Sequence, residues 1–185
     1  DHVGGVDGKR ILIDTGESPS RGSKEWHKRV MTGLEADIGA NGRIDLVWIT
    51  HQHSDHLGGV PDVVANFEVA KYVHNGTTPS TKVVTDAIAA AKSEAAVMVV
   101  KPGQTKVPLA SKDVTLTAIV PSSWPTKCDD DPNDCSILLR IDYCKSSVLF
   151  TGDAEEKEEK LLDVKHATLL QVGHHGSDTS SSEDF

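Results

Sequence analysis

Long hydrophobic runs, basic clusters and cysteines are all scarce in this sequence of 185 residues. No apolar run approaches the roughly 20 residues of a membrane-spanning helix, and none has the pattern of a secretory signal peptide, so no membrane segment is predicted. Lysine and arginine are scattered, with one small cluster at Lys24, Lys28 and Arg29, and the formal net charge is −9. Since nucleic-acid binders usually carry a basic patch, this charge disfavours a nucleic-acid partner but leaves it possible.

The three cysteines give a limited redox signal, and none has the spacing of zinc ligands. Cys128 and Cys135 flank the acidic loop 129–134. The pair forms either a disulfide, which would favour an extracytoplasmic or secreted location, or two free thiols, and the spacing leaves both open. Cys144 is expected to pack as a small apolar residue in a strand.

Composition and periodicity predict one domain over residues 1–185, because 37% hydrophobic and 25% charged residues are ordinary globular usage. Trp26, Val30, Leu34 and Ile38 recur every four residues and predict an amphipathic helix over 24–38 that packs on a sheet. Further helices are expected at 57–67, 81–96 and 155–162. Strands are expected at 44–49, 69–74, 97–100, 114–120, 136–143, 146–151 and, as a final buried strand, 167–172, with a tight hairpin at Cys144-Lys145.

The most informative segment is Thr50-His51-Gln52-His53-Ser54-Asp55-His56-Leu57-Gly58-Gly59, directly after the apolar run 44–49. A strand that ends there places three imidazoles and a carboxylate at one edge of a sheet. His51 and His53 suit one metal ion, while Asp55 and His56 suit a second ion nearby. The alternative is a solvated His-rich turn, but such a turn needs neither this spacing nor the glycine pair that turns the chain into a helix.

This motif resembles the signature of the metallo-β-lactamase superfamily. Three further segments match that resemblance in chain order: Arg10-Ile11-Leu12-Ile13-Asp14-Thr15-Gly16, then Val148-Leu149-Phe150-Thr151-Gly152-Asp153-Ala154-Glu155, then Leu169-Leu170-Gln171-Val172-Gly173-His174-His175-Gly176-Ser177. The motif Thr-Gly-Asp-Ala-Glu, followed by Gly-His-His-Gly-Ser, is similar to motifs in the hydrolase domain of ComEC-type DNA-uptake proteins and their soluble relatives. The resemblance therefore extends over nearly the whole chain.

The resemblance implies an α/β (α+β) fold, the αββα sandwich of two mixed sheets flanked by helices, here truncated at the C-terminus. It implies two divalent metal ions, Zn²⁺ before Mn²⁺, holding a hydroxide that attacks a phosphoester. The substrate is then a small molecule or another phosphoester. Two alternatives stay open. One is hydrolysis of a β-lactam or lactone on the same metals, which is disfavoured because many β-lactamases carry Cys where this chain has Asp153. The other is a non-catalytic metal-binding module.

The resemblance also assigns roles to the later motifs. Asp153 would bridge the two ions, although Gly-Asp after a strand is by itself more typical of a turn or a helix N-cap. Glu155 is expected to favour the dipole of the following helix rather than to bind metal. Asp14 is expected to orient a ligand histidine through its ring N–H.

His174 and His175 are adjacent, so they point in different directions if the chain is extended. We expect one to complete the second metal's ligands, with His174 the first choice, and the other to contact substrate or a carboxylate. Asp55 and His175 are the candidate catalytic residues. The candidate metal ligands are His51, His53, Asp55, His56, Asp153 and His174. The hydroxyl-rich turn that follows, with Ser177, either binds a phosphate or caps a helix through Ser180-x-x-Glu183.

One departure from the superfamily concerns the third ligand of the first metal. Many members carry a further ligating histidine between the His cluster and the bridging aspartate, whereas this chain has only His74 in that interval. Its position is early for that ligand, so substrate contact or a surface position is expected instead. The Asn133-Asp134 loop is a candidate source of an oxygen there, and Asn133 is a candidate substrate contact.

Overall fold

The computed structural model describes residues 2–4, 8–77, 81–103, 106–108, 111 and 113–185. Its first sheet has the order β1-β2-β4-β6-β7 and its second the order β11-β10-β9-β8. The first sheet is built from β1 (His2–Gly4), β2 (Arg10–Ile13), β4 (Leu46–Trp48), β6 (Lys71–His74) and β7 (Ala96–Val99). The second is built from β8 (Val114–Ile119), β9 (Leu138–Tyr143), β10 (Ser146–Phe150) and β11 (Leu169–Gln171). A small third sheet pairs β3 (Arg43–Ile44) with β5 (Glu68–Val69).

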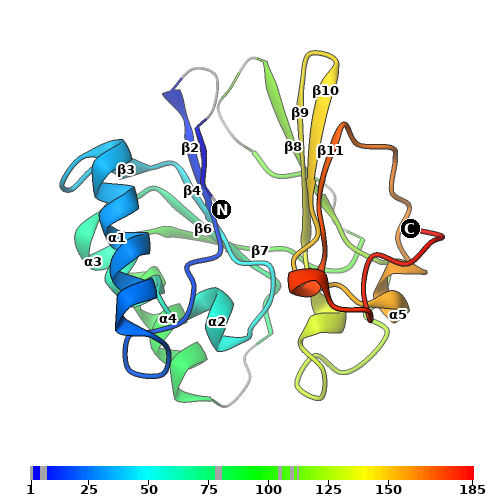
Figure 1. Ribbon diagram of the computed structural model, residues 1–185, viewed down its shortest axis with the longest axis horizontal. Coiled ribbons are helices and arrows are strands. Elements are labelled where there is room, and N and C mark those ends of the chain that lie inside the picture. Colours follow the sequence, from blue (N-terminus) through cyan, green and yellow to red (C-terminus); the bar gives the residue numbers. More distant parts are fainter. Residues whose placement is uncertain (1, 5–7, 78–80, 104–105, 109–110, 112) are drawn as a thin grey trace.

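The two large sheets pack face to face, as Figure 1 shows. Alternate residues of β2 explain this arrangement, because successive side chains of a strand point to opposite faces. Ile11 and Ile13 belong to the core between the sheets, together with Trp48 of β4 and Leu139 of β9. Leu12 points the other way, into the core beneath the helices. The predicted sandwich is confirmed.

Three helices cover the outer face of the first sheet (Figure 1): α1 (Lys24–Ile38), α3 (Val60–Asn66) and α4 (Lys82–Glu94). Helix α1 has the predicted bounds and is capped by Ser23, whose Oγ accepts a hydrogen bond from the backbone N–H of Trp26. The second sheet has a smaller outer layer, in which Leu138 and Leu149 pack against Leu162 and Phe185. No described helix is long and apolar enough to cross a membrane.

The helix predicted at 57–67 is wrong as a single element. The chain instead forms a short helix α2 (Ser54–Leu57), bends at Gly58 and Gly59, and restarts as α3. The bend is held because Gly59 donates its N–H to Gly16 O at 3.0 Å. A Cβ at Gly59 would lie 2.4 Å from Thr15 O, so only glycine permits this approach. Pro61, in the first turn of α3, lacks the N–H that a continuous helix would need.

Four other sequence predictions are corrected. The run 44–49 is divided at Asp45, whose carboxylate accepts hydrogen bonds from Lys9 and from the backbone N–H of Arg10. The predicted helix at 155–162 shortens to α5 (Glu156–Glu159). The final strand is not buried, because β11 is the edge strand of its sheet and Leu169 is 62% exposed. Cys144 is exposed at the β9–β10 turn instead of packing in a strand.

Cys128 and Cys135 form a disulfide with a Cα–Cα distance of 5.6 Å. It closes the acidic loop and lies at the end of η2 (Asn133–Cys135), a short 3-10 helix. Asn75 donates to the carbonyl of Cys135 at 2.8 Å and accepts from Gln52 at 3.0 Å, so this loop is tied to the His-rich segment. Of the two alternatives for the cysteine pair, the structure contains the disulfide.

Candidate metal centre

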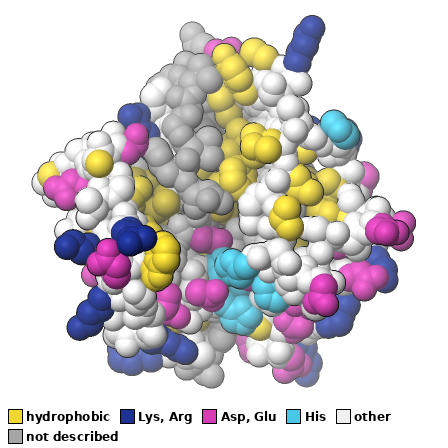
Figure 2. Space-filling view, viewed as in Figure 1, with side chains coloured by type: hydrophobic (Ala, Val, Ile, Leu, Met, Phe, Trp, Pro, Cys, Tyr) yellow, Lys and Arg dark blue, Asp and Glu magenta, His cyan; other side chains and the backbone are white. Residues whose placement is uncertain are grey.

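The candidate site lies where the carboxyl ends of four strands meet. β2 and β4 are parallel neighbours in one sheet, and β10 and β11 are parallel neighbours in the other. The segments that follow them carry the four motifs recognised in the sequence. A hydrogen bond from Ile137 N to Thr50 O, 2.8 Å long, joins the two sheets beside the site. The result is a cluster of imidazoles at the seam between the sheets, visible as the histidine patch in Figure 2.

Asp153 is the centre of this cluster. Its Oδ2 lies within 4.0 Å of the Nε2 atoms of four histidines, at distances of 3.2 Å for His56, 3.4 Å for His175, 3.9 Å for His51 and 4.0 Å for His174. The Asp153 side chain is only 4% exposed, and the positive charge of the surrounding imidazoles lowers its pKa although burial acts in the opposite direction. One oxygen of a buried carboxylate thus faces four imidazole nitrogens, and both are donor types that divalent metals accept.

Two groups of metal-capable side chains overlap at His56, and Asp153 belongs to the first of them. The first contains His51, His56 and Asp153, and all three residues are buried. The second contains Asp55, His56 and His175, of which Asp55 and His175 are exposed. In the second group His175 Nε2 lies 3.5 Å from Asp55 Oδ2. One half of the centre is therefore enclosed by protein and the other half is open to solvent.

Asp14 holds the ring of His56 in place. Its Oδ2 lies 2.7 Å from His56 Nδ1, and its two oxygens also accept from the backbone N–H and the hydroxyl of Thr50. The Nδ1–H is thereby committed to Asp14, and Nε2 is directed at Asp153. Burial acts to lower the pKa of His56, but the hydrogen bond to Asp14 and the charges of Asp14 and Asp153 outweigh it and raise the pKa to about 10.

His51 and His53 differ in their surroundings. His51 is fully buried, and both burial and the neighbouring imidazoles hold its pKa well below the usual value, so that the ring is neutral. Its Nδ1 lies 3.1 Å from Thr50 Oγ1, and its Nε2 lies 3.0 Å from Nδ1 of His53. His53 is thus brought beside His51, although it is not part of either group around Asp153.

The His174-His175 turn is not extended. Both residues have left-handed backbone angles, with φ of 44° and 53°, inside η3 (His174–Gly176). Such angles are unfavourable for two consecutive non-glycine residues. They bring both rings to Asp153, so the expectation that the two rings point apart is wrong. His175, rather than His174, completes the group with Asp55 and His56.

The carboxylate of Glu155 contacts residues of the candidate site. The residue precedes the helix and caps no backbone N–H. Its Oε1 lies 3.2 Å from His174 Nδ1, 3.2 Å from the hydroxyl of Thr179 and 3.3 Å from Asn133 Nδ2. Glu155 thus lies at the N-cap position of α5, as the dipole expectation requires, and also contacts the ring of His174, much as Asp14 contacts His56.

Asn133 and Ser177 lie on either side of His174. Asn133 is buried, and its Nδ2 is 3.5 Å from His174 Nε2. Ser177 Oγ is 3.0 Å from the Thr179 hydroxyl and accepts from the backbone N–H of Thr179. Ser180 begins no helix, so the predicted capping box is wrong and these hydroxyls are held in a turn. This turn is fixed by Glu159, which accepts the N–H groups of Ser181 and Ser182.

His74 is not brought to the cluster. It is buried, and its Nδ1 accepts the backbone N–H of Gly76 at 3.2 Å. Burial and the charge of Lys92 lower the pKa of His74 to about 4, so the ring is neutral. The surface position allowed for it in the sequence is wrong, because the ring packs beside Tyr72 in the interior.

A third group of metal-capable side chains lies next to the centre. It is entirely acidic and contains Asp131, Asp134 and Glu155. Lys157 compensates its charge, with Nζ 3.0 Å from Asp134 Oδ2 and 3.6 Å from Asp131 Oδ2. Asp134 is fully buried, and burial raises its pKa. This group shares Glu155 with the His174 side of the site.

Sequence analysis missed three residues that position the site. Thr50 lies between Asp14 and the rings of His51 and His56, Glu17 accepts the Ser54 hydroxyl at 2.6 Å, and Asn75 links Gln52 to the disulfide loop. Thr50 stands directly before the His-rich motif, and that position is its only signal in the sequence. The other two are single polar residues in loops, and no local pattern distinguishes them.

The residues present fit divalent metal ions. The donor set is imidazole nitrogen and carboxylate oxygen without thiolate, which suits Zn²⁺, Mn²⁺ or Fe²⁺. Buried His56 Nε2 and Asn133 Oδ1 form no acceptable hydrogen bond with any described residue. Since buried polar atoms are almost always satisfied, an unmatched Nε2 beside two carboxylates is the signature expected of a metal ligand.

Comparison with known proteins agrees with this geometry. The family model described as the metallo-beta-lactamase superfamily matches residues 3–185. The chain belongs to the metallo-β-lactamase superfamily. Members are generally metal-dependent hydrolases, and this chain is one of them.

Two curated relatives match over most of this chain. ComE operon protein 3 of Bacillus subtilis is 29% identical over an alignment 192 positions long, which covers 95% of this chain and 24% of that protein. Recombination protein 2 of Haemophilus influenzae is 28% identical over 183 residues, with shares of 95% and 20%. The chain thus spans a quarter or less of the length of either relative. Among solved structures, human tRNase Z, short form, shares the fold with a TM-score of 0.53 at 16% identity, covering 91% of this chain and 68% of that one.

Proposed function

We propose that this domain hydrolyses phosphoester bonds with two divalent metal ions, Zn²⁺ before Mn²⁺. The observation that supports this most strongly is Asp153, because one of its buried oxygens lies within 4.0 Å of four imidazole nitrogens, and the two metal-capable groups beside it overlap at His56. A bridging carboxylate between two ligand groups is the arrangement that a two-metal hydrolase needs.

We assign the ligand roles from these contacts. His51 and Asp153 would hold one ion together with His53, which lies in neither group but has its Nδ1 3.0 Å from His51 Nε2. Asp55, His56 and His175 would hold the second ion with the same carboxylate of Asp153. When bound, the ions would polarise the phosphoryl oxygen and lower the pKa of a water molecule. Asp14 fixes the tautomer of His56 so that Nε2 is available as the ligand atom.

His174 is left for the substrate. Because Glu155 occupies Nδ1 of the ring, Nε2 is the nitrogen available to exchange a proton with the leaving-group oxygen. Asn133 Nδ2 and the hydroxyl of Ser177 lie on either side of His174 and are suited to donate hydrogen bonds to phosphoryl oxygens. We therefore assign His174 to substrate contact and His175 to the metal, in place of the order expected from the sequence.

The site's surroundings bear on the size of the substrate. The half that contains Asp55 and His175 is exposed, so a phosphodiester can reach the metals without entering a closed pocket. The name of the Haemophilus relative, Recombination protein 2, refers to recombination. Nucleic acid is therefore included among the substrates to be tested. The net charge of −9 favours a small or uncharged ester instead.

The test is a hydrolysis screen of metal-replete protein with bis(p-nitrophenyl) phosphate, p-nitrophenyl phosphate, single-stranded DNA and a chromogenic β-lactam. We expect turnover of the diester with Zn²⁺ or Mn²⁺ and none after chelation. His174→Gln should lower kcat more than it raises KM, while Asp130→Asn, an exposed change on the acidic loop, should leave both constants unchanged. Turnover of the β-lactam alone would overturn the phosphoester assignment and keep the two-metal centre.

A further inference from the structure

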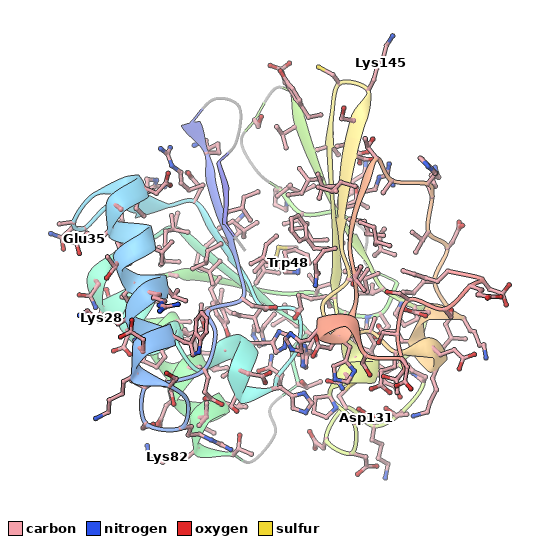
Figure 3. The ribbon with its side chains drawn as sticks, in the orientation of Figure 1. Lys28, Glu35, Trp48, Lys82, Asp131 and Lys145 are labelled. Carbon is pink, nitrogen blue, oxygen red and sulfur yellow. A yellow bond between two sulfur atoms is a disulfide. The ribbon has the colours of Figure 1, made fainter. Side chains whose placement is uncertain are left out.

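The acidic group beside the Asp153 centre differs from that centre in its donor atoms. Asp131, Asp134 and Glu155 each place one carboxylate oxygen within 4.8 Å of the others. Asp131, which is labelled in Figure 3, lies below the second sheet, at the same end of the molecule as η3. Imidazole nitrogen suits Zn²⁺, whereas a group made of oxygen atoms suits a hard cation. The two groups are therefore adapted to different kinds of ion.

Acidic side chains on a surface need no cation, because water solvates them, but this group extends into the interior. Asp134 is 0% exposed, and its Oδ1 has no hydrogen-bond partner in the described part of the chain. Oδ1 of Asn133 is also buried and unpartnered, and Nδ2 of the same amide contacts Glu155 at 3.3 Å. Since buried oxygens are almost always satisfied, two unmatched oxygens beside a carboxylate group point to a bound cation.

Glu155 has a further oxygen to offer. Its contacts with His174, Thr179 and Asn133 all use Oε1, which leaves Oε2 available to a ligand. One carboxylate can therefore orient the ring of His174 through one oxygen and bind a cation through the other.

One ammonium group faces the three carboxylates. Nζ of Lys157 lies 3.0 Å from Asp134 Oδ2 and 3.6 Å from Asp131 Oδ2, so part of the negative charge remains uncompensated. The side chain of Lys157 is 60% exposed, and its flexible stem allows the ammonium to turn into solvent when a cation binds. Lys157 therefore competes with a cation for Asp131 and Asp134 without blocking access to them.

The loop that carries these oxygens is fixed by its own contacts. The disulfide between Cys128 and Cys135 closes it, and the backbone N–H groups of Asp130 and Asp131 donate to the carbonyl of Lys127 at 2.8 and 3.2 Å. Asn75 holds the far end through the carbonyl of Cys135. A cation that binds here therefore meets ligands that are already ordered, which favours its affinity.

We infer that Asp131, Asn133, Asp134 and Glu155 form a Ca²⁺ site, distinct from the two metal ions of the proposed hydrolase. Ca²⁺ accepts six to eight carboxylate, amide and water oxygens in a flexible arrangement, whereas Mg²⁺ demands a near-ideal octahedron, so this mixed set fits Ca²⁺. The ion would join the disulfide loop to Glu155 and so fix the two residues that contact His174. The inference goes beyond the proposed function and does not depend on it.

The test is a calorimetric titration of CaCl₂ into protein that has first been saturated with Zn²⁺. We expect one Ca²⁺ to bind per chain, with a dissociation constant on the order of 10⁻⁵ to 10⁻³ M. Asp131→Asn should weaken Ca²⁺ binding at least about tenfold, because it removes a charged ligand oxygen. The control is Asp130→Asn, the same change at an exposed neighbour outside the group, and it should alter the dissociation constant by less than about twofold.

Lys157→Met provides a second variant, chosen because its side chain competes with the ion instead of binding it. The substitution should tighten Ca²⁺ binding, since no ammonium then has to leave Asp131 and Asp134. If neither the wild type nor Lys157→Met binds Ca²⁺, the site does not exist and Lys157 is the counter-ion of the group.

Three further results would also overturn the site. Equal weakening in Asp130→Asn and Asp131→Asn would indicate diffuse attraction of Ca²⁺ to an acidic loop. Ca²⁺ binding that survives in Asp131→Asn but is lost in Asp153→Ala would place the ion at the histidine cluster. A loss of Zn²⁺ together with Ca²⁺ in Asp131→Asn would mean that the two sites are one. None of these results alters the hydrolase assignment, which is tested separately by turnover.

Discussion

The Nδ1 atom of His56 lies 2.7 Å from Oδ2 of Asp14, although 42 positions separate the two residues in the sequence. The parallel pairing of β2 with β4 brings them together, because the carboxyl ends of neighbouring parallel strands lie at the same edge of a sheet. The contact leaves Nε2 of His56 directed at Asp153, 3.2 Å away. The fold thus orients the ring of a candidate metal ligand.

Asp14→Asn tests this orientation. Asn tolerates the left-handed backbone that Asp14 adopts, with φ of 55°, so the substitution removes the charge while keeping the local fold. We expect the affinity for Zn²⁺ to fall about 10- to 100-fold, as is typical when the partner of a ligating histidine is changed. Competition with a chromogenic chelator measures the affinity. Asp62→Asn on α3 is the control, and equal affinities of the two variants would contradict the role of Asp14.

The raised pKa of His56 predicts a pH dependence of the metal-free protein. Its folded pKa of about 10 lies above the ordinary value of 6.5, so the protonated ring stabilises the fold fully below pH 6.5. This stabilisation is lost as the pH rises toward 10. Urea unfolding of chelator-treated protein should therefore show a falling free energy of unfolding between pH 7 and 10. The fall should be smaller in Asp14→Asn, and identical slopes would argue against this pair.

His74 predicts the opposite trend in acid. Its folded pKa of about 4 lies below 6.5, because the ring is buried and lies near Lys92. The unfolded chain binds the proton first, so stability is lost as the pH falls from 6.5 toward 4, by about 3 kcal/mol at pH 4. His74→Gln should lose this component, as measured by chemical unfolding at several pH values. If the free energy of unfolding of the variant falls between pH 6.5 and 4 as steeply as that of the wild type, other groups cause the loss.

The disulfide gives a stability prediction. Cys128 and Cys135 are seven positions apart, and closing so short a loop constrains the unfolded chain by about 2–3 kcal/mol. The double substitution to Ser should lower the free energy of unfolding by that amount. Cys144→Ser, at an exposed turn, should change it by less than about 0.5 kcal/mol. Equal effects of the two changes would contradict a structural role for the disulfide.

The sequence predicted those parts of the centre that follow from strand order. His51 to His56 stand together directly after an apolar strand, so their proximity needs no knowledge of the rest of the fold. Asp153 and the His174-His175 pair were recognised through the resemblance, because each follows a strand whose partner is not evident from local pattern. The sandwich itself was predicted from the same resemblance, with which the mixture of expected strands and helices along the chain agrees.

What the sequence did not predict depends on backbone angles and long-range contacts. The left-handed turn at His174 and His175 brings both rings to Asp153 and places His175 beside Asp55, and neither contact is evident from the local sequence. The local sequence around Glu155 indicates only an acidic residue at the start of a helix. Its contacts with Asn133 and His174 join residues about 20 positions away and depend on the tertiary fold. The break at Gly58-Gly59 depends on Thr15 and Gly16, which lie more than 40 positions earlier.

The central claim is that Asp153 joins two metal ions in one centre, and the decisive measurement is the number of ions bound per chain in Asp153→Ala. Wild-type protein should hold about two ions, and the variant should hold fewer, with diester turnover reduced by orders of magnitude and a native far-UV circular dichroism spectrum. The control is Asp130→Ala, which removes an exposed carboxylate of the acidic loop 129–134. This variant should keep both ions and full turnover. Two ions and near-normal turnover in Asp153→Ala would contradict the account.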